Sequence, residues 1–254
     1  MSKQAIILLM ITLLYSVNSY SAECVVLLHG LARTSSSMNE LEQKLIKEGY
    51  YVANIDYPSR KKEIVELSEI AVNEGLGKCN ENSAAPVNFV THSLGGILVR
   101  QYYKNHAPEN VNRVVMLGPP NNGSEVVDNL KDTPGFELFN GPAGMQLGTQ
   151  DKDIPKSLGP VNFELGVIAG TQSINLLLST FLPNPDDGKV SVESTKVDGM
   201  SGFVALPATH PFLMKNDQVI DEVINFLEHG EFQSKLAINR ATEGLSKGKQ
   251  IPGS

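Results

Sequence analysis

One stretch of the sequence reads Val87-Asn-Phe-Val-Thr-His-Ser-Leu-Gly-Gly96. It starts as a short apolar run, typical of a buried strand, and helical spacing of apolar residues follows it directly. The turn between them, Thr91 to Gly95, matches a nucleophile elbow, in which a strained strand-to-helix turn holds a serine hydroxyl above the sheet. Thr91 stands where glycine is usual. The sequence thus indicates Ser93 as a nucleophile, and a plain turn with a capping serine is the alternative.

On both sides of this stretch, short apolar runs alternate with helical periodicity. Strands are predicted at residues 24–28, 51–55, 87–90, 111–117, 163–169 and 202–206. Helices are predicted around residues 38–46, with Ser37 and Glu40 as a capping box, around 64–72 with an end near Gly75 and Gly77, around 97–102 and around 219–227. This order predicts an α/β fold, a mostly parallel sheet with helices on both faces.

Length and composition favour one large domain. The 254 residues are 41 % hydrophobic, which is enough for a sizeable core. Their net charge of −7 argues against a nucleic-acid or anionic-membrane partner that needs a basic surface. No phosphate-binding loop and no histidine pair at ligand spacing occurs in the sequence, so we expect no cofactor and no metal.

The first 22 residues have the layout of a secretory signal peptide, with a charged start, a short apolar run and a small residue at Ala22. A buried first helix is the alternative. We therefore expect export to the periplasm or the medium, with no membrane span after signal removal. The catalytic domain is predicted at residues 23–230 and a polar tail at 231–254.

Cys24 and Cys79 are the two cysteines of the chain. An even count in an exported protein favours a disulfide between them, with two unconnected thiols as the alternative.

Further segments resemble those of one superfamily. Leu27-Leu-His-Gly-Leu31 is similar to the His-Gly oxyanion loop of α/β-hydrolases, and Asn184-Pro-Asp-Asp-Gly-Lys-Val190 is similar to the segment that carries the acid in lipases. Over residues 24–230 the chain resembles a small bacterial lipase or esterase of the α/β-hydrolase superfamily. The resemblance implies an oxyanion hole made by the backbone N–H groups of Leu31 and Leu94, and a structural role for His29.

A serine nucleophile needs a base and an acid, and in this fold they follow it in the order serine, acid, histidine. His210 lies in a loop between the last predicted strand and the last helix, where the base belongs. His229 ends a helix and needs no catalytic role. Asp187 is the favoured acid because it precedes Gly188 in the lipase-like segment. The alternatives for the acid are its neighbour Asp186 and the later Glu193 and Asp198.

The predicted function is hydrolysis of carboxylic esters through an acyl-enzyme on Ser93, acting on a small-molecule or lipid ester. Thioester hydrolysis and acyl transfer would use the same residues, and an inactive binding protein is the rival class. Residues 119–160 are rich in Pro, Gly and Asn, and they predict short loops with little or no lid. We expect apolar residues there to line an acyl pocket that prefers short to medium chains, namely Phe136, Leu138, Phe139, Met145 and Leu147.

Overall fold

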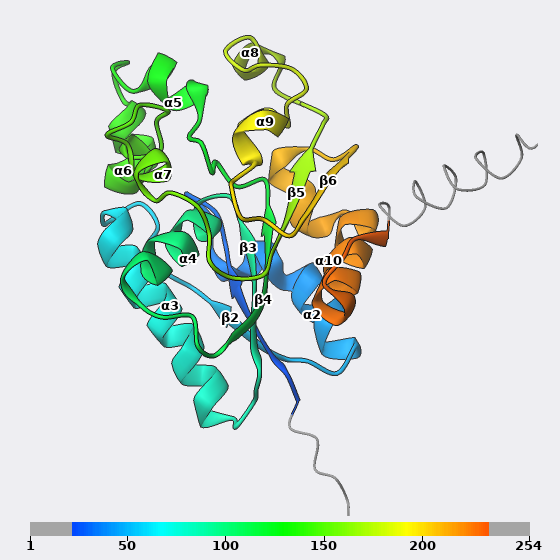
Figure 1. Ribbon diagram of the computed structural model, residues 1–254. Coiled ribbons are helices and arrows are strands. Elements are labelled where there is room, and N and C mark those ends of the chain that lie inside the picture. The colour runs from blue at the N-terminus through cyan, green and yellow to red at the C-terminus, as the bar shows by residue number, and fades with distance from the viewer. Residues whose placement is uncertain (1–21, 234–254) are drawn as a thin grey trace, which may run out of the picture.

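The computed structural model describes residues 22–233. Its centre is a six-stranded sheet in the order β2-β1-β3-β4-β5-β6, and every neighbouring pair runs parallel (Figure 1). The strands are β1 (Cys24–Leu28), β2 (Tyr51–Ile55), β3 (Val87–His92), β4 (Val111–Leu117), β5 (Leu165–Gly170) and β6 (Gly202–Leu206). The predicted α/β class with a parallel sheet is confirmed.

Helices cover both faces of the sheet (Figure 1). They are α2 (Asn39–Lys47), α3 (Ile64–Glu81), α4 (Leu94–Asn105), α5 (Glu125–Leu130), α6 (Phe136–Met145), α7 (Ile154–Ser157), α8 (Leu176–Ser179), α9 (Val192–Thr195) and α10 (Asp217–His229), with 3-10 turns η1 (Ser35–Met38) and η2 (His210–Lys215). Side chains alternate between the two faces along a strand. Val26 therefore packs in the core under α3 and α4, whereas Val25 and Leu27 pack in the core under α2 and α10.

Two local predictions about helix ends are wrong. Helix α3 continues through Gly75 and Gly77 to Glu81, because Gly75 lies against strand β1. A Cβ at Gly75 would come within 2.4 Å of Val26 Cγ1, so the glycine allows close packing and does not end the helix. The capping box is also absent, because η1 precedes α2 and the Ser37 hydroxyl donates to the Thr34 carbonyl instead.

The predicted disulfide is confirmed. Cys24 at the start of β1 is bonded to Cys79 near the end of α3, with a Cα–Cα distance of 5.7 Å and both residues buried. The bond attaches α3 to the sheet at the end opposite the site described below.

The chain termini bear on the predicted domain limits. The polar tail is predicted to begin at residue 231, but Phe232 is fully buried and its ring lies against that of Phe226 in α10, with the ring centroids 4.9 Å apart. The packed domain therefore extends past residue 230. The predicted signal peptide, apart from Ala22, and the tail from residue 234 lie outside the described residues. Within residues 22–233, no helix has both the length and the apolar character needed to cross a bilayer.

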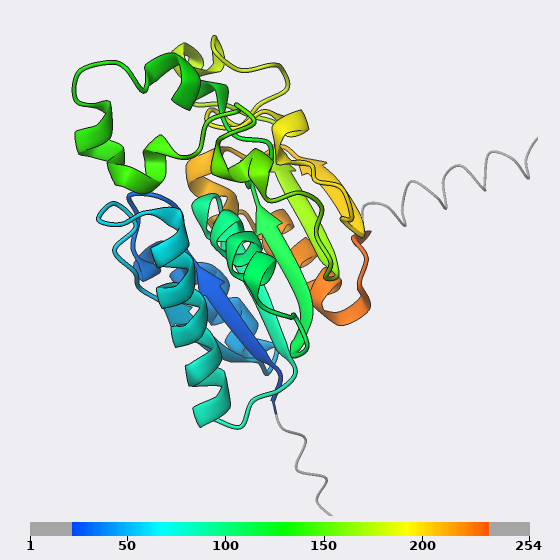
Figure 2. The same cartoon turned by 60° about the vertical axis from the view of Figure 1, so that its left-hand side comes forward.

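Helices α5, α6, α7 and α8 are short and lie together beyond the carboxyl ends of the strands (Figure 2). Helix α6 is kinked at Gly141, and α8 has four residues, none of them buried. In an open parallel sheet, ligands bind beyond the carboxyl ends of the strands where neighbouring connections diverge. This part of the fold is therefore where a site is expected.

Candidate active site

Ser93 occupies the turn between β3 and α4 in a strained conformation. Its φ of 52° and ψ of −117° are rarely adopted by a residue with a side chain. The Ser93 N–H donates to the Leu117 carbonyl at 2.9 Å, which helps hold the turn in place. Gly95 lets the helix pass close to β1, since a Cβ there would be 2.6 Å from the Leu28 carbonyl oxygen. The turn has the geometry of a nucleophile elbow, and threonine at position 91 is accommodated, fully buried.

His210 faces this serine from the loop after β6. Its Nε2 lies 3.1 Å from Ser93 Oγ, and its Nδ1 lies 2.7 Å from Asp187 Oδ2. The imidazole is buried and the Asp187 carboxylate is almost fully buried. With the Nδ1 proton donated to Asp187, Nε2 is free to accept the serine proton, as general-base activation of a hydroxyl requires.

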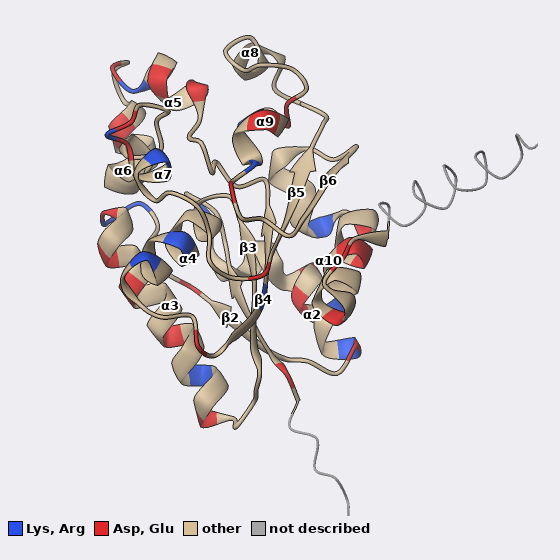
Figure 3. Cartoon of the chain, viewed as in Figure 1, with Lys and Arg blue, Asp and Glu red and all other residues tan. Residues whose placement is uncertain are grey.

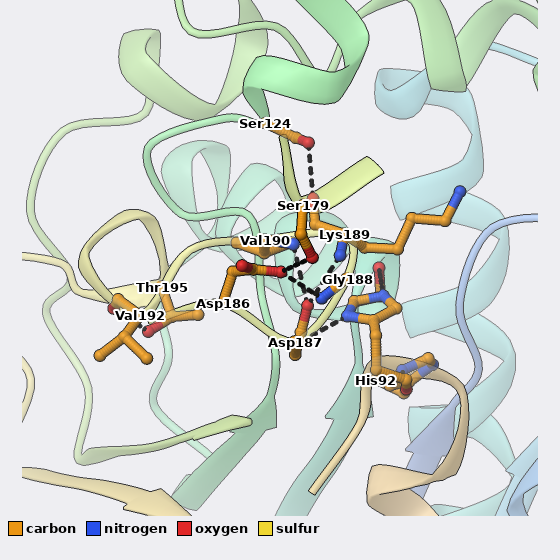
Figure 4. Close-up of polar contacts among 12 residues, drawn as sticks. His92, Ser124, Ser179, Asp186, Asp187, Gly188, Lys189, Val190, Val192 and Thr195 are labelled. Carbon is orange, nitrogen blue, oxygen red and sulfur yellow. Dashed lines mark hydrogen bonds and ion pairs between the residues drawn. The ribbon is translucent and has the colours of Figure 1, made fainter. Parts of the chain in front are cut away.

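The two adjacent aspartates point to different partners. Besides His210, the Asp187 carboxylate accepts the N–H groups of Lys189 and Val190 through Oδ1, at 3.0 and 2.9 Å. The Asp186 carboxylate has other partners (Figure 4). Its Oδ1 accepts from the Ser179 hydroxyl at 2.8 Å and from the Gly188 N–H at 2.7 Å. The structure thus brings Asp187, and not Asp186, to His210.

Gly118, the residue after β4, was not singled out from the sequence. A Cβ there would lie 2.9 Å from Asp187 Oδ2 and 3.1 Å from His210 Nδ1. Its φ of 54° also favours glycine. Gly118 therefore leaves room for the aspartate–histidine pair, a requirement that no local sequence signal reveals.

The two amides expected to form an oxyanion hole come from separate segments. Leu94 is the first residue of α4, where backbone N–H groups lack intrahelical acceptors, and Leu31 follows the His29-Gly30 pair. Neither N–H donates to a group within residues 22–233. Leu31 lines the same cleft as Ser93. Two unpaired donors flanking a serine can stabilise a developing negative charge.

His29 has structural contacts only, in agreement with its expected role. Its ring stacks on Tyr57 with centroids 4.0 Å apart, and Nε2 accepts the Tyr57 N–H at 3.3 Å. The Tyr57 hydroxyl in turn donates to the His29 carbonyl. Burial lowers the pKa of His29, which keeps the ring neutral in this stack. These contacts fix the loop that carries Leu31.

His92, next to the nucleophile, was also missed by sequence reasoning. Its Nε2 donates to the His210 carbonyl at 2.9 Å, and the two rings lie 4.8 Å apart. Burial, and secondarily the nearby charge of His210, hold the pKa of His92 well below its usual value. A neutral His92 thus anchors the backbone of the residue that faces Ser93.

Above these residues lies a cleft of about 390 Å³. One wall is apolar and comes from the α5–α6 region, with Val126, Val127, Leu130, Phe136 and Leu147. Lys189 lines the mouth, and its side chain extends away from the aspartate turn (Figure 4). Desolvation by the surrounding wall lowers the pKa of Lys189, against the opposite effect of Asp187.

The predicted acyl-pocket residues are divided by the structure. Phe136 and Leu147 line the cleft as expected. The prediction is wrong for Leu138 and Phe139, which point outward on α6 and are 80 % and 69 % exposed. Met145 does not line the cleft. Helical spacing explains the division, because neighbours within one helix face different directions.

The family model described as palmitoyl protein thioesterase matches residues 24–154, more than half of the chain. The chain belongs to this family. The match includes the elbow and the His29-Gly30 loop, while Asp187 and His210 lie beyond it. The protein is therefore a hydrolase of the α/β fold, from the group that contains esterases, lipases and thioesterases. No curated protein matches the sequence.

Solved structures show the same fold. The mature lipase BlEst2 from Bacillus licheniformis superposes with a TM-score of 0.66 at 19 % identity, covering 82 % of this chain and 93 % of that one. The phospholipase PlaB from Legionella pneumophila gives 0.67 at 16 % identity, covering 90 % and 63 %. The esterase EaEST from Exiguobacterium antarcticum gives 0.57 at 16 % identity, covering 82 % and 92 %. At such identities the likeness establishes the fold, and the predicted α/β-hydrolase resemblance is confirmed.

Proposed function

We propose that this thioesterase-family protein hydrolyses carboxylic esters, with Ser93 as nucleophile, His210 as general base and Asp187 as the acid that orients it. The observation that carries the proposal is the unbroken chain of hydrogen bonds from Ser93 Oγ to His210 and on to Asp187, at 3.1 and 2.7 Å. Ser93, at one end of this chain of hydrogen bonds, lines an open cleft with an apolar wall. A hydroxyl, an oriented imidazole and a buried carboxylate are the parts that acyl transfer needs.

The chemistry follows from these positions. Ser93 Oγ attacks the carbonyl carbon while His210 Nε2 takes its proton, and Asp187 stabilises the imidazolium that forms. The oxygen of the tetrahedral intermediate accepts hydrogen bonds from the backbone N–H groups of Leu31 and Leu94. Leu94 stands at the N-terminus of α4, which is the positive end of the helix dipole. His210 then protonates the departing alcohol, leaving an acyl group on Ser93. Water, deprotonated by the same imidazole, releases the acid.

The acyl chain is assigned to the apolar wall of the cleft. Side chains from the α5–α6 region make that wall apolar, and burial of an acyl chain there is favourable by roughly 0.8 kcal/mol per methylene. The alcohol then leaves toward the mouth, past Lys189.

Thioester hydrolysis is the second candidate, because the matching family is described by that activity. The same serine, histidine and amides would serve, since a thiolate leaves more readily than an alkoxide. Acyl transfer differs only in the acceptor that replaces water, and it remains an alternative for the same site.

Export is part of the proposal. The disulfide between Cys24 and Cys79 supports an extracytoplasmic location, because such bonds persist in oxidising compartments. Residues 1–22 would be removed as a signal peptide, and the protein would act in the periplasm or outside the cell.

The test combines labelling with matched substrates. A fluorophosphonate probe should modify Ser93, and Ser93→Ala should abolish labelling, whereas Ser201→Ala, at an exposed serine elsewhere, should label as the unaltered protein does. Butyryl and palmitoyl groups, each offered as a p-nitrophenyl ester and as an N-acetylcysteamine thioester, then separate the two activities. Labelling of a different serine would refute the nucleophile. Turnover of thioesters alone would replace ester hydrolysis by the second candidate.

A further inference from the structure

Large apolar side chains are exposed at one end of this molecule. We call six of them the apolar rim: Leu138 at 80 %, Phe139 at 69 %, Ile174 at 65 %, Leu176 at 76 %, Leu177 at 72 % and Phe212 at 52 % exposed. Ile46 and Val65 are the other strongly exposed large apolar residues within 22–233, and they lie on helices α2 and α3. The rim is thus a concentration of exposed apolar surface.

The rim borders the mouth of the cleft. Each of its three segments also supplies a residue to the lining, namely Asn140 on α6, Leu178 on α8 and Pro211 beside Phe212. Helices α6 and α8 both stand beyond the carboxyl ends of the strands (Figure 2). The rim therefore lies on the same three segments that line the cleft at Ser93.

The α8 segment is unusual for a surface loop. Residues 171–185 contain no charged side chain, and α8 is free of the acidic and basic colours that mark other helices (Figure 3). Leu178 turns into the cleft, whereas Leu176 and Leu177 turn to solvent. Apolar clusters of this kind on a protein surface mark sites of contact with another apolar phase or partner.

The charges next to the rim indicate which partner. Arg33, Arg60 and Lys61, which we call the cationic collar, line one hollow together with Leu138 of the rim. None of the three makes an ion pair within the described chain, although Asp56 shares the hollow. Elsewhere, Lys62 pairs with Glu66 on α3. The net charge of −7 disfavours an anionic surface for the chain as a whole, but the three unpaired cations beside the apolar rim complement a negatively charged lipid surface locally.

We propose that the apolar rim and the cationic collar dock this protein on the surface of an anionic lipid bilayer, with the mouth of the cleft facing the lipid. The leucines of α8 and Phe139 enter the boundary between headgroups and acyl chains, and the collar contacts phosphate groups. An acyl ester can then pass from the bilayer into the cleft without crossing water. The inference rests on the proposed function only for the identity of the cleft as the active site.

This docking changes the substrate expected from the sequence. Loops rich in Gly, Pro and Asn predicted a preference for soluble esters of short and medium chains. The exposed side chains of α6 and α8 favour long-chain esters presented by a lipid surface, because an apolar rim gives no advantage with a dissolved substrate.

Vesicle flotation tests the proposal with the full chain. The protein carrying Ser93→Ala is mixed with 100 nm vesicles of phosphatidylcholine, with or without phosphatidylglycerol, and the bound fraction gives a partition coefficient. Because the readout is binding, it does not depend on hydrolysis, and a failure of the proposed function would leave it intact. Binding should increase with phosphatidylglycerol and decrease with salt.

Matched variants locate the surface. Leu176→Ser with Leu177→Ser should lower the partition coefficient by at least about tenfold, since two leucines lose their burial in lipid. Ile46→Ser with Val65→Ser, at equally apolar but remote positions, should lower it less than about twofold. Lys61→Gln should lower it by roughly fivefold on anionic vesicles, and Lys47→Gln, at the exposed end of α2, should not.

Three results would overturn the docking. The first is the absence of binding to phosphatidylglycerol vesicles, and the second is an equal loss of vesicle binding in the rim pair and the control pair of variants. The third is a protein that sediments as a dimer and binds no vesicles, when the Leu176→Ser with Leu177→Ser variant sediments as a monomer. The last result would assign the rim to contact between two copies. Thermal unfolding of each variant checks that the loss of binding is not a loss of folding.

Discussion

Exchange of the two neighbouring aspartates for asparagine gives the sharpest test of the proposed acid. In Asp187→Asn the side-chain oxygen should stay where Oδ1 is, because two N–H groups, of Lys189 and Val190, point at that position. The new amide nitrogen then faces His210 Nδ1 and donates to it. The imidazole must place its own proton on Nε2, which can no longer accept from Ser93.

The magnitude follows from that reversal. Loss of the correct tautomer in a serine, histidine and aspartate arrangement lowers kcat by about 10⁴, which equals about 5.5 kcal/mol of transition-state stabilisation. In Asp186→Asn the retained oxygen can still accept from the Ser179 hydroxyl and the Gly188 N–H. We expect this variant to lose about 1 kcal/mol of stability and less than about tenfold in kcat.

The assay is hydrolysis of p-nitrophenyl butyrate by both variants, with the rate of fluorophosphonate labelling as a second readout and urea unfolding as the control for folding. Labelling of Asp187→Asn should slow together with turnover, because both depend on activation of Ser93. A larger loss in Asp186→Asn than in Asp187→Asn would refute the assignment. More than a tenth of the original kcat in Asp187→Asn would refute the tautomer argument.

Two further predictions concern stability. Folding holds the pKa of His92 well below the value of about 6.5 that it has in an unfolded chain. As the pH drops below about 6.5, the unfolded state therefore takes up a proton that the folded state does not. The free energy of unfolding should then fall by up to about 1.4 kcal/mol per pH unit. Urea unfolding between pH 7.5 and 5.0 should show a shallower decline for His92→Gln, which keeps a donor for the His210 carbonyl, and an unchanged slope would contradict the reasoning. The disulfide closes a loop with a separation of 55 residues, so Cys24→Ser with Cys79→Ser should cost about 4 kcal/mol of unfolding free energy. A loss below about 1 kcal/mol would show that the bond does little to restrict the unfolded chain.

The sequence determined much of the fold because burial leaves a periodic record. Strands β1 to β4 and helix α10 lie within a few residues of their predicted places, since each carries a continuous or evenly spaced set of apolar residues. The turn around Ser93 was readable for a related reason. Its strand, its serine and its glycines are neighbours in the chain, and the steric demands of the turn act on those residues themselves. His210 was singled out by chain order and by its place in the loop between the last predicted strand and the last helix.

Only the tertiary structure decided in which direction individual side chains point. Asp186 and Asp187 are adjacent residues of the same type, and the path of the backbone around Gly188 turns Asp187, and not Asp186, toward His210. Gly75 was predicted to end a helix, because its real role is not visible locally. That role is close contact with Val26, a residue 49 positions away in the chain. Leu138 and Phe139 seemed to belong to a pocket, because apolar character does not tell whether a side chain points inward or outward on a short helix. Local sequence records which residues prefer burial, but the side to which each one faces is fixed by packing between segments that are distant in the chain.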